Sequence, residues 1–266
     1  DCLGKIEQAS GHLLKLINEV LNMSKIESGR MELIEKPILI HSVVDNVLML
    51  LQDNIEKKKM TLQVDMDRLP EESVYGDATR ILEILLNLAS NAVKYTPEGG
   101  TVTLTITETE PEHPEYASYR ILVEDTGIGM SEEYLPHIFE EFTREHSSTE
   151  SHITGTGLGL PIVKSLVNLM GGTIDVESEL GAGTITTICL TFELPTEEQL
   201  AAHQHKDEIL EQSLQTLSEK RVLLAEDNDL NAEIAMEILM KEGLVIDRVE
   251  DGIQCVHRIE QSPAGT

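Results

Sequence analysis

Two asparagines on one predicted helix form the first candidate site. Asn87 and Asn91 lie four residues apart in "NLASNAVKY", so their side chains share one face of the helix. Amide oxygens on one face can ligate a hard cation such as Mg²⁺ without adding net charge. Lys94 is close enough to reach a phosphate that the metal bridges, and Tyr95 could stack on a base. Taken alone, such an asparagine pair is usually part of an ordinary polar helix surface.

A carboxylate followed by two glycines forms the second candidate. Asp125 ends a predicted strand in "VEDTGIGM", and Gly127 and Gly129 follow it. A carboxylate at a strand end can accept a hydrogen bond from an exocyclic amine such as that of adenine. Glycines beside it permit positive φ angles and a close approach of the backbone to a flat ring. The alternative is a tight turn from a strand into a helix.

Three glycines at alternate positions, in "GTGLGL" at residues 155–160, form the third candidate. The dinucleotide fingerprint needs GxGxxG directly after a strand, whereas this stretch has GxGxG after a polar segment. The lysine that a P-loop requires is missing. What remains is a run of backbone N–H groups leading into a helix N-terminus, which suits an oligophosphate.

Helices and strands that position these stretches can be read from the hydrophobic periodicity. Helical patterns cover residues 1–27, 43–59, 78–96 and 160–170, with Ser42 predicted to cap the second of them. Strand patterns cover residues 60–66, 101–107, 119–125, 173–178 and 184–194. Residues 196–219 are polar with weak periodicity and are interpreted as a linker. A strand, helix, strand and helix start then follow in 220–266.

The amino-acid composition restricts the classes of molecule that this chain can bind. A net charge of −28 argues against nucleic acid and anionic membranes, so a bound polyanion must be neutralised by a metal ion and a few local cations. The three cysteines are far apart and suggest neither a zinc site nor a disulfide framework, which fits a reducing cytoplasm. No apolar run is long enough to cross a bilayer, and no signal peptide is recognised. The chain lacks an initiator Met, so we expect a piece of a longer protein.

The order of the three stretches within one domain is more specific than any one of them. Residues 33–195 resemble the catalytic ATP-binding domain of bacterial sensor histidine kinases. The matching motifs are "NLASNAVKYTPEGG" (the N box), "VEDTGIGM" (the first G box), "IFEEFTRE" (the F box), "GTGLGL" (the second G box) and "ELGAGT" (the third). Residues 1–30 look like the second helix of that family's dimerisation hairpin, and residues 220–266 look like the start of a receiver domain. The arrangement resembles a hybrid histidine kinase.

This resemblance implies a fold and an activity. The expected fold class is α+β: a two-layer sandwich of the Bergerat type, with a mixed sheet packed on helices. One hairpin helix precedes it and an incomplete flavodoxin-like receiver follows it. The implied cofactors are ATP and Mg²⁺, and the implied reaction moves the γ-phosphate to a histidine and then to a receiver aspartate. The implied partners are a second copy, bound through the hairpin, and a receiver domain or response regulator. The expected location is the cytoplasm, whether or not the parent is anchored in the inner membrane.

The resemblance also assigns residues to the metal and the phosphates. Asn91 would ligate Mg²⁺, with Asn87 beside it, and Lys94 would contact phosphate. Arg144, just after the F box, would reach the phosphates from the lid. The second G box would close over them with five residues: Gly155, Thr156, Gly157, Leu158 and Gly159.

The same resemblance assigns residues to the base. Asp125 would recognise the adenine amino group, in a pocket shaped by Gly127 and Gly129, and Tyr95 would line the nucleotide site. Thr187, on the last strand, would support Asp125.

Two alternatives to a kinase stay open at this point, namely an ATPase of the same superfamily and a nucleotide-binding module without turnover. In the related hydrolysing ATPases, a glutamate four residues before the metal asparagine activates water. Here that position holds Asn87, which lacks the carboxylate of a general base. Phosphoryl transfer needs mainly positioning and charge neutralisation, so the sequence favours transfer over hydrolysis.

Both phosphate acceptors of the family are expected to be missing. None of the nine histidines stands in the family's acceptor pattern, and His12 falls on the second hairpin helix, where the family has no acceptor. Glu226 and Asp227 look like the acidic pair that holds Mg²⁺ in receivers, but the strand that carries the acceptor aspartate is not reached. We therefore expect this chain alone not to phosphorylate itself.

Overall fold

The computed structural model describes residues 2–66, 69, 72–145, 156–201, 220–241 and 243–261. The chain divides into two compact units, residues 1–196 and 197–266. Among the described residues, no helix combines the length and the apolar character that spanning a membrane requires.

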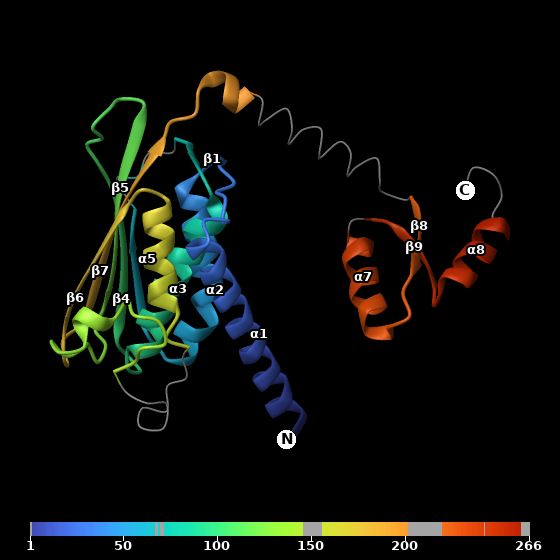
Figure 1. Cartoon of the computed structure of the whole chain (residues 1–266), viewed down its shortest axis with the longest axis horizontal. Coiled ribbons are helices and arrows are strands. Elements are labelled where there is room, and N and C mark those ends of the chain that lie inside the picture. The colour runs from blue at the N-terminus through green and yellow to red at the C-terminus, as the bar shows by residue number, and fades with distance from the viewer. Residues whose placement is uncertain are drawn as a thin grey trace. The chain divides into compact units, whose positions relative to one another are not determined.

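A seven-stranded mixed sheet forms one layer of the first unit (Figure 1). Its strands lie in the order β1-β3-β7-β5-β4-β2, and β6 pairs with β7 beside that path. Only β2 and β4 run parallel, and the other pairs are antiparallel. The strands are β1 (Lys36–Ile38), β2 (Thr61–Asp65), β3 (Val74–Gly76), β4 (Thr101–Thr109), β5 (Tyr116–Asp125), β6 (Thr173–Glu179) and β7 (Gly183–Glu193).

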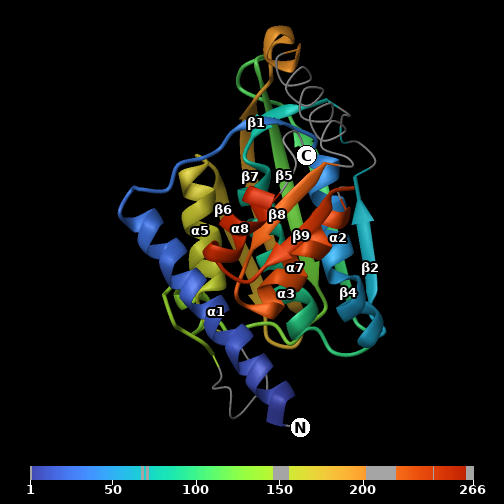
Figure 2. The same cartoon turned by 90° about the vertical axis from the view of Figure 1, so that its right-hand side faces the viewer.

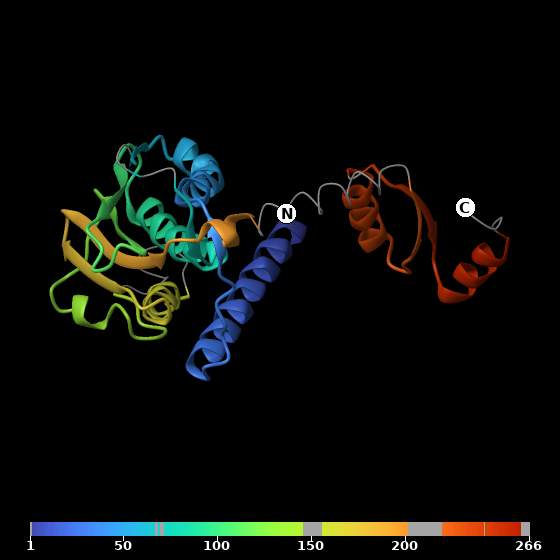
Figure 3. The ribbon, with the colours of Figure 1, turned by 90° about the horizontal axis from the view of Figure 1, so that it is seen from above.

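Three helices form the second layer and cover one face of the sheet (Figures 1 and 3). They are α2 (Ile40–Lys57), α3 (Ala78–Tyr95) and α5 (Gly159–Leu169). Alternate residues of the central strands point toward them, so that Val102, Leu104 and Ile106 of β4 are each at most 2 % exposed. Aliphatic side chains from the helices fill the space between the layers. The predicted α+β sandwich is confirmed.

A long helix, α1 (Cys2–Glu27), packs along α5 and reaches α3 (Figure 2). The amide of Asn22 donates to the carboxylate of Glu83 on α3 at 3.1 Å. The hydroxyl of Ser165 on α5 lies 4.0 Å from the sulfur of Met23. The C-terminal half of α1 therefore belongs to the first unit.

Three local features differ from the sequence prediction. The strands β1 and β3 were not predicted, because each has only three residues and is held by pairing with its neighbours. The prediction that Ser42 caps α2 is wrong, since the helix begins at Ile40 after Leu39, whose side chain makes no capping hydrogen bond. A strong cap lies instead on α3, where buried Asp77 accepts from the N–H groups of Thr79 and Arg80 at 3.0 and 3.1 Å.

The second unit contains two parallel strands, β8 (Arg221–Ala225) and β9 (Val245–Val249), and two helices, α7 (Asp229–Lys241) and α8 (Gly252–Gln261). The order of elements is the one that the sequence predicts. The guanidinium of Arg258 on α8 donates to Asp247 on β9 at 2.6 and 2.9 Å, which ties the last helix to the sheet. Residues 202–219 of the predicted linker lie outside the described residues.

Lys58 holds the C-terminal end of α3, the helix that carries both asparagines. Its ammonium group donates to the carbonyl oxygens of Val93, Lys94 and Thr96 at 2.7, 2.9 and 2.9 Å. A cation at a helix C-terminus satisfies carbonyls that have no partner within the helix and interacts favourably with the helix dipole.

The Lys58→Met change should therefore lower the free energy of unfolding by about 2 kcal/mol. Lys59→Met is the matched control, because the side chain of the neighbouring Lys59 forms an exposed ion pair with Glu98. That control should cost less than about 0.5 kcal/mol. Urea unfolding monitored by circular dichroism measures both values, and equal effects of the two changes would refute the capping role of Lys58.

Candidate functional site

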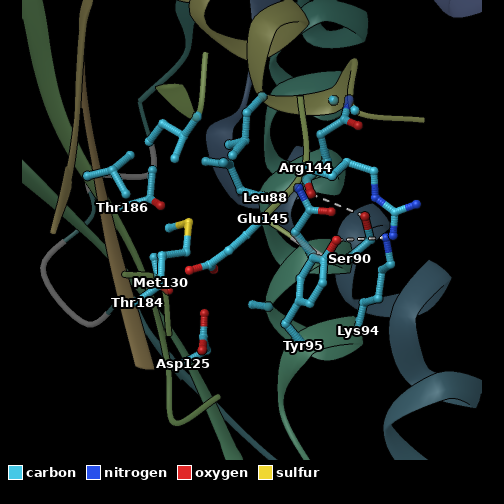
Figure 4. Close-up of a pocket in the computed structure, with 18 of the residues that line it drawn as sticks. Leu88, Ser90, Lys94, Tyr95, Asp125, Met130, Arg144, Glu145, Thr184 and Thr186 are labelled. Carbon is cyan, nitrogen blue, oxygen red and sulfur yellow. Dashed lines mark hydrogen bonds between the residues drawn. The ribbon is translucent and has the colours of Figure 1, made fainter. Parts of the chain in front are cut away.

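A cavity of about 350 Å³ opens between the C-terminal half of α3 and the sheet. This volume lies in the range of small-molecule sites. Segments far apart in the sequence line it, including β5, the stretch 128–145, the first turn of α5, and strands β6 and β7. Figure 4 shows two sides of the cavity, with Asp125, Met130, Thr184 and Thr186 on one and Ser90, Lys94, Tyr95 and Arg144 on the other.

The face of α3 predicted to hold metal and phosphate does line the cavity, with Asn87, Asn91, Lys94 and Tyr95. The amide nitrogen of Asn87 donates to the Glu83 carbonyl at 2.9 Å. Its oxygen faces Gly159, where an added Cβ would lie 3.2 Å away. The geometry thus leaves an acceptor oxygen of Asn87 directed toward the N-terminus of α5.

Lys94 and Tyr95 contact one another. The Lys94 ammonium lies 3.2 Å from the Tyr95 hydroxyl and 4.6 Å from the centre of its ring. Arg144 lies on the same side of the cavity (Figure 4). Positive charge is therefore gathered at one end of a cavity in a chain that is strongly acidic overall.

Asp125 lies at the other end, at the terminus of β5. The Gly127 N–H donates to its Oδ1 at 2.8 Å. Burial raises the pKa of the Asp125 carboxyl group above its ordinary value of 3.8, and the hydrogen bonds from the Gly127 and Thr184 backbone offset part of that rise. Asp125 is thus a partly desolvated acceptor, which strengthens its interaction with a donor from a ligand.

The prediction that Thr187 supports Asp125 is wrong. In the register of β5 and β7, Thr184 is opposite Asp125 and Thr186 is opposite Val123, whereas Thr187 is opposite Leu122. Successive side chains of a strand point to opposite faces, so Thr187 lies on the face away from the cavity. Thr184 and Thr186 line the cavity instead.

The second G box is only partly in the cavity. Thr156, Gly157 and Gly159 line it, as expected. Leu158 is not among the lining residues, because its side chain is 1 % exposed within the core, and its N–H donates to the Thr156 hydroxyl at 3.2 Å. Gly155 lies outside the described residues. Gly129 lines the cavity, and Gly127 acts through its N–H bond to Asp125.

Several lining residues were not identified from the sequence. Tyr134, Thr143 and Glu145 come from the irregular stretch around the F box, and Glu19 comes from α1. No periodic pattern marks the first three, and only the packing of α1 on the domain brings Glu19 to the cavity. Burial raises the pKa of the Tyr134 phenol, and the neighbouring Tyr95 raises it further.

Glu226 and Asp227, the acidic pair predicted to hold Mg²⁺ in the second unit, directly follow β8. One oxygen of Glu226 accepts from the Asn228 N–H at 3.1 Å, and Asp227 is exposed. In the part of the chain that the structure describes, no three acids, histidines or cysteines cluster as a metal site would require. A magnesium site at Glu226 and Asp227 stays a prediction.

Comparison with known proteins agrees with this geometry. Residues 76–196 match the family model described as histidine kinase-, DNA gyrase B-, and HSP90-like ATPase. The chain is 35 % identical to the sensor protein GacS of Pseudomonas syringae pv. syringae over 99 % of its own length. It is 34 % identical over 94 % of its length to LuxQ of Vibrio cholerae, described as an autoinducer 2 sensor kinase/phosphatase. The chain contains a histidine kinase-type ATP-binding domain.

Two solved structures are similar in fold to this chain. The chain is 26 % identical to full-length ShkA, solved in complex with AMPPNP, with a TM-score of 0.59 over 97 % of this chain and 49 % of that one. The structure of the Acinetobacter baumannii histidine kinase AdeS shares the fold, with 22 % identity and a TM-score of 0.57 over 73 % of this chain and 84 % of that one. The chain spans 28 % of the length of both curated relatives.

Proposed function

We propose that this chain is the catalytic core of a hybrid sensor histidine kinase, which transfers the γ-phosphate of ATP to a histidine and from there to a receiver aspartate. The polarity of the cavity is the observation that carries this proposal. Amide oxygens and the cations Lys94 and Arg144 lie at one end, and the partly desolvated acceptor Asp125 lies at the other (Figure 4). An adenine nucleotide presents a donor amine at one end and polyphosphate at the other, which matches this arrangement.

The residues at the cationic end also fit Mg²⁺ bound with ATP. Asn91 would hold the metal, with Asn87 beside it on the same face of α3, because amide oxygens are ligands that hard cations accept. When bound, the metal would neutralise charge on the phosphates. Lys94 and Arg144 would orient the phosphates, and the N-terminus of α5 would face them.

Transfer rather than hydrolysis is supported by the identity of residue 87. On the face of α3 that lines the cavity, Asn87 presents a neutral amide, which cannot take a proton from water as a carboxylate can. The domain's own contribution to transfer is then positioning of the nucleotide and stabilisation of charge.

Dimerisation through α1 is part of this proposal. Apolar side chains exposed on α1 recur at steps of three and four residues: Leu13, Leu14, Ile17, Val20 and Leu21. Such a stripe is suited to packing against further helices. We extend the proposal to a cytoplasmic location, to the second unit as part of a receiver that becomes phosphorylated, and to Mg²⁺ binding there by Glu226 and Asp227.

Titration calorimetry with ATP tests the nucleotide site. The full chain should bind ATP more tightly with Mg²⁺ than with a chelator. Asn91→Ala should weaken binding at least about tenfold in Mg²⁺, equal to about 1.4 kcal/mol, and should have little effect in the chelator. Asn54→Ala, on an exposed position of α2, is the matched control. Absence of adenine-nucleotide binding would refute the proposal, and steady phosphate release that Asn91→Ala abolishes would favour an ATPase.

A further inference from the structure

Two side-chain hydrogen bonds join the stretch 131–134 to the stretch 143–145 at the edge of the cavity. The carboxylate of Glu145 accepts from the Ser131 N–H at 2.9 Å. The Tyr134 hydroxyl donates to the Thr143 carbonyl at 3.2 Å. We call these four residues the clasp. Their bonds link main chain that lies before η1 (Leu135–His137) to main chain that follows it.

Arg144 lies between Thr143 and Glu145, two residues of the clasp. Thr143 is fixed through its carbonyl and Glu145 through its carboxylate, so the backbone on both sides of Arg144 is tied. A third hydrogen bond holds the residue before Thr143, because the Phe142 N–H donates to the Gly157 carbonyl at 3.1 Å. An arginine carries several rotatable bonds, and restricting its backbone reduces the entropy lost when it binds a phosphate.

The clasp also keeps a negative charge away from the phosphate end. Glu145 lines the cavity, where a carboxylate turned toward ATP would repel it. Figure 4 shows the Glu145 side chain extending toward Met130, away from Lys94. Met130 precedes Ser131, whose N–H holds the carboxylate there.

We propose that Tyr134 and Glu145 are positioning residues that hold Arg144 toward the phosphates and thereby give the site its preference for nucleotides over nucleosides. This inference rests on the proposed binding of ATP in the same cavity. It predicts a phosphate-specific defect when the clasp is broken. A merely structural role would weaken binding of every ligand alike.

Binding of ATP and of adenosine to the full chain separates these outcomes. Tyr134→Phe and Glu145→Ala should each weaken ATP binding about tenfold and leave adenosine binding within about twofold. Glu145→Gln keeps an acceptor for the Ser131 N–H and should restore ATP binding to near the wild-type value. Tyr116→Phe, which changes an exposed tyrosine outside the cavity, should change neither affinity.

A double-mutant cycle tests whether the clasp acts through Arg144. If it does, adding Tyr134→Phe to Arg144→Ala should weaken ATP binding by less than about twofold beyond Arg144→Ala alone. Full additivity, an unchanged ATP affinity in both single variants, or equal losses for ATP and adenosine would overturn the inference while leaving nucleotide binding intact. A wild-type chain that binds neither ligand would instead overturn the proposed function.

Discussion

Replacing Asp125 with Asn should weaken ATP binding about 100-fold without destabilising the domain. The Gly127 N–H takes one acceptor atom of residue 125, so an asparagine would direct its amide N–H groups at the adenine amine. Two donors then face each other, and a charge-assisted hydrogen bond of about 1.5–3 kcal/mol is lost. GTP carries an acceptor at the same position of the ring, so its affinity should not fall. Calorimetry with both nucleotides measures the two effects.

The stability of the Asp125→Asn variant follows from the raised pKa of Asp125. Between the unfolded pKa and the higher folded pKa, the folded state binds more protons than the unfolded state, so stability falls as the pH rises through this window. Above this pH window, the carboxylate of Asp125 is ionised in the folded state, and its burial lowers the free energy of unfolding. The nucleotide-free variant should therefore melt at the same temperature as wild type, or higher, at pH 7. In wild type, ATP binding should weaken on acidification with a half-point above 3.8, a step that the variant lacks.

Glu124→Gln provides the control for Asp125→Asn. Glu124 is the preceding residue of β5 and is exposed on the other face of the sheet, so both substitutions remove one carboxylate. Glu124→Gln should leave ATP and GTP affinity unchanged. Equal losses of ATP affinity in the two variants would show that net charge, rather than contact with adenine, explains the effect.

Replacing Gly129 with Ala should destabilise the domain by more than about 3 kcal/mol and abolish ATP binding. Gly129 has φ +63°, and an added Cβ would overlap the carbonyl oxygen of Glu179 at the end of β6. That contact cannot relax easily, because the Gly181 N–H donates to the Ile128 carbonyl at 2.7 Å and fixes the hairpin turn against this stretch. Thermal unfolding with and without ATP measures both losses.

Gly181→Ala separates backbone strain from steric overlap. Gly181 has φ +82°, but an added Cβ there would meet nothing within 4 Å. This variant should lose only about 1 kcal/mol, the usual cost of a positive φ for alanine, and should still bind ATP. Similar losses in Gly129→Ala and Gly181→Ala would contradict the close packing of the 127–130 stretch against the turn.

The parts of the fold that repeat regularly were predictable from the sequence. Helical spacing places Asn87 and Asn91 on one face of α3, and the strand pattern ends at Asp125, so both sides of the cavity were identified. The face of β7 that lines the cavity was not identified. Thr186 lines the cavity and the next residue, Thr187, does not, so an error of one residue changes the face.

Features that depend on tertiary contacts were missed for a common physical reason. β1 and β3 have three residues each, too few for a periodic signal, and exist because neighbouring strands pair with them. Tyr134 and Glu145 lie in irregular backbone, where spacing carries no information about direction. Leu158 falls within a glycine-rich motif, yet its side chain fills the core while the glycines around it face the cavity.

Transfer of label from γ-labelled ATP to a separately supplied acceptor hairpin helix tests the central claim most directly. The full chain with Mg²⁺ should label the histidine of that helix and should carry no stable label itself. Asn91→Ala and Asp125→Asn should reduce the rate of labelling, and Glu124→Gln should not. An unlabelled acceptor together with steady release of phosphate, or stable label on the chain alone, would contradict the account.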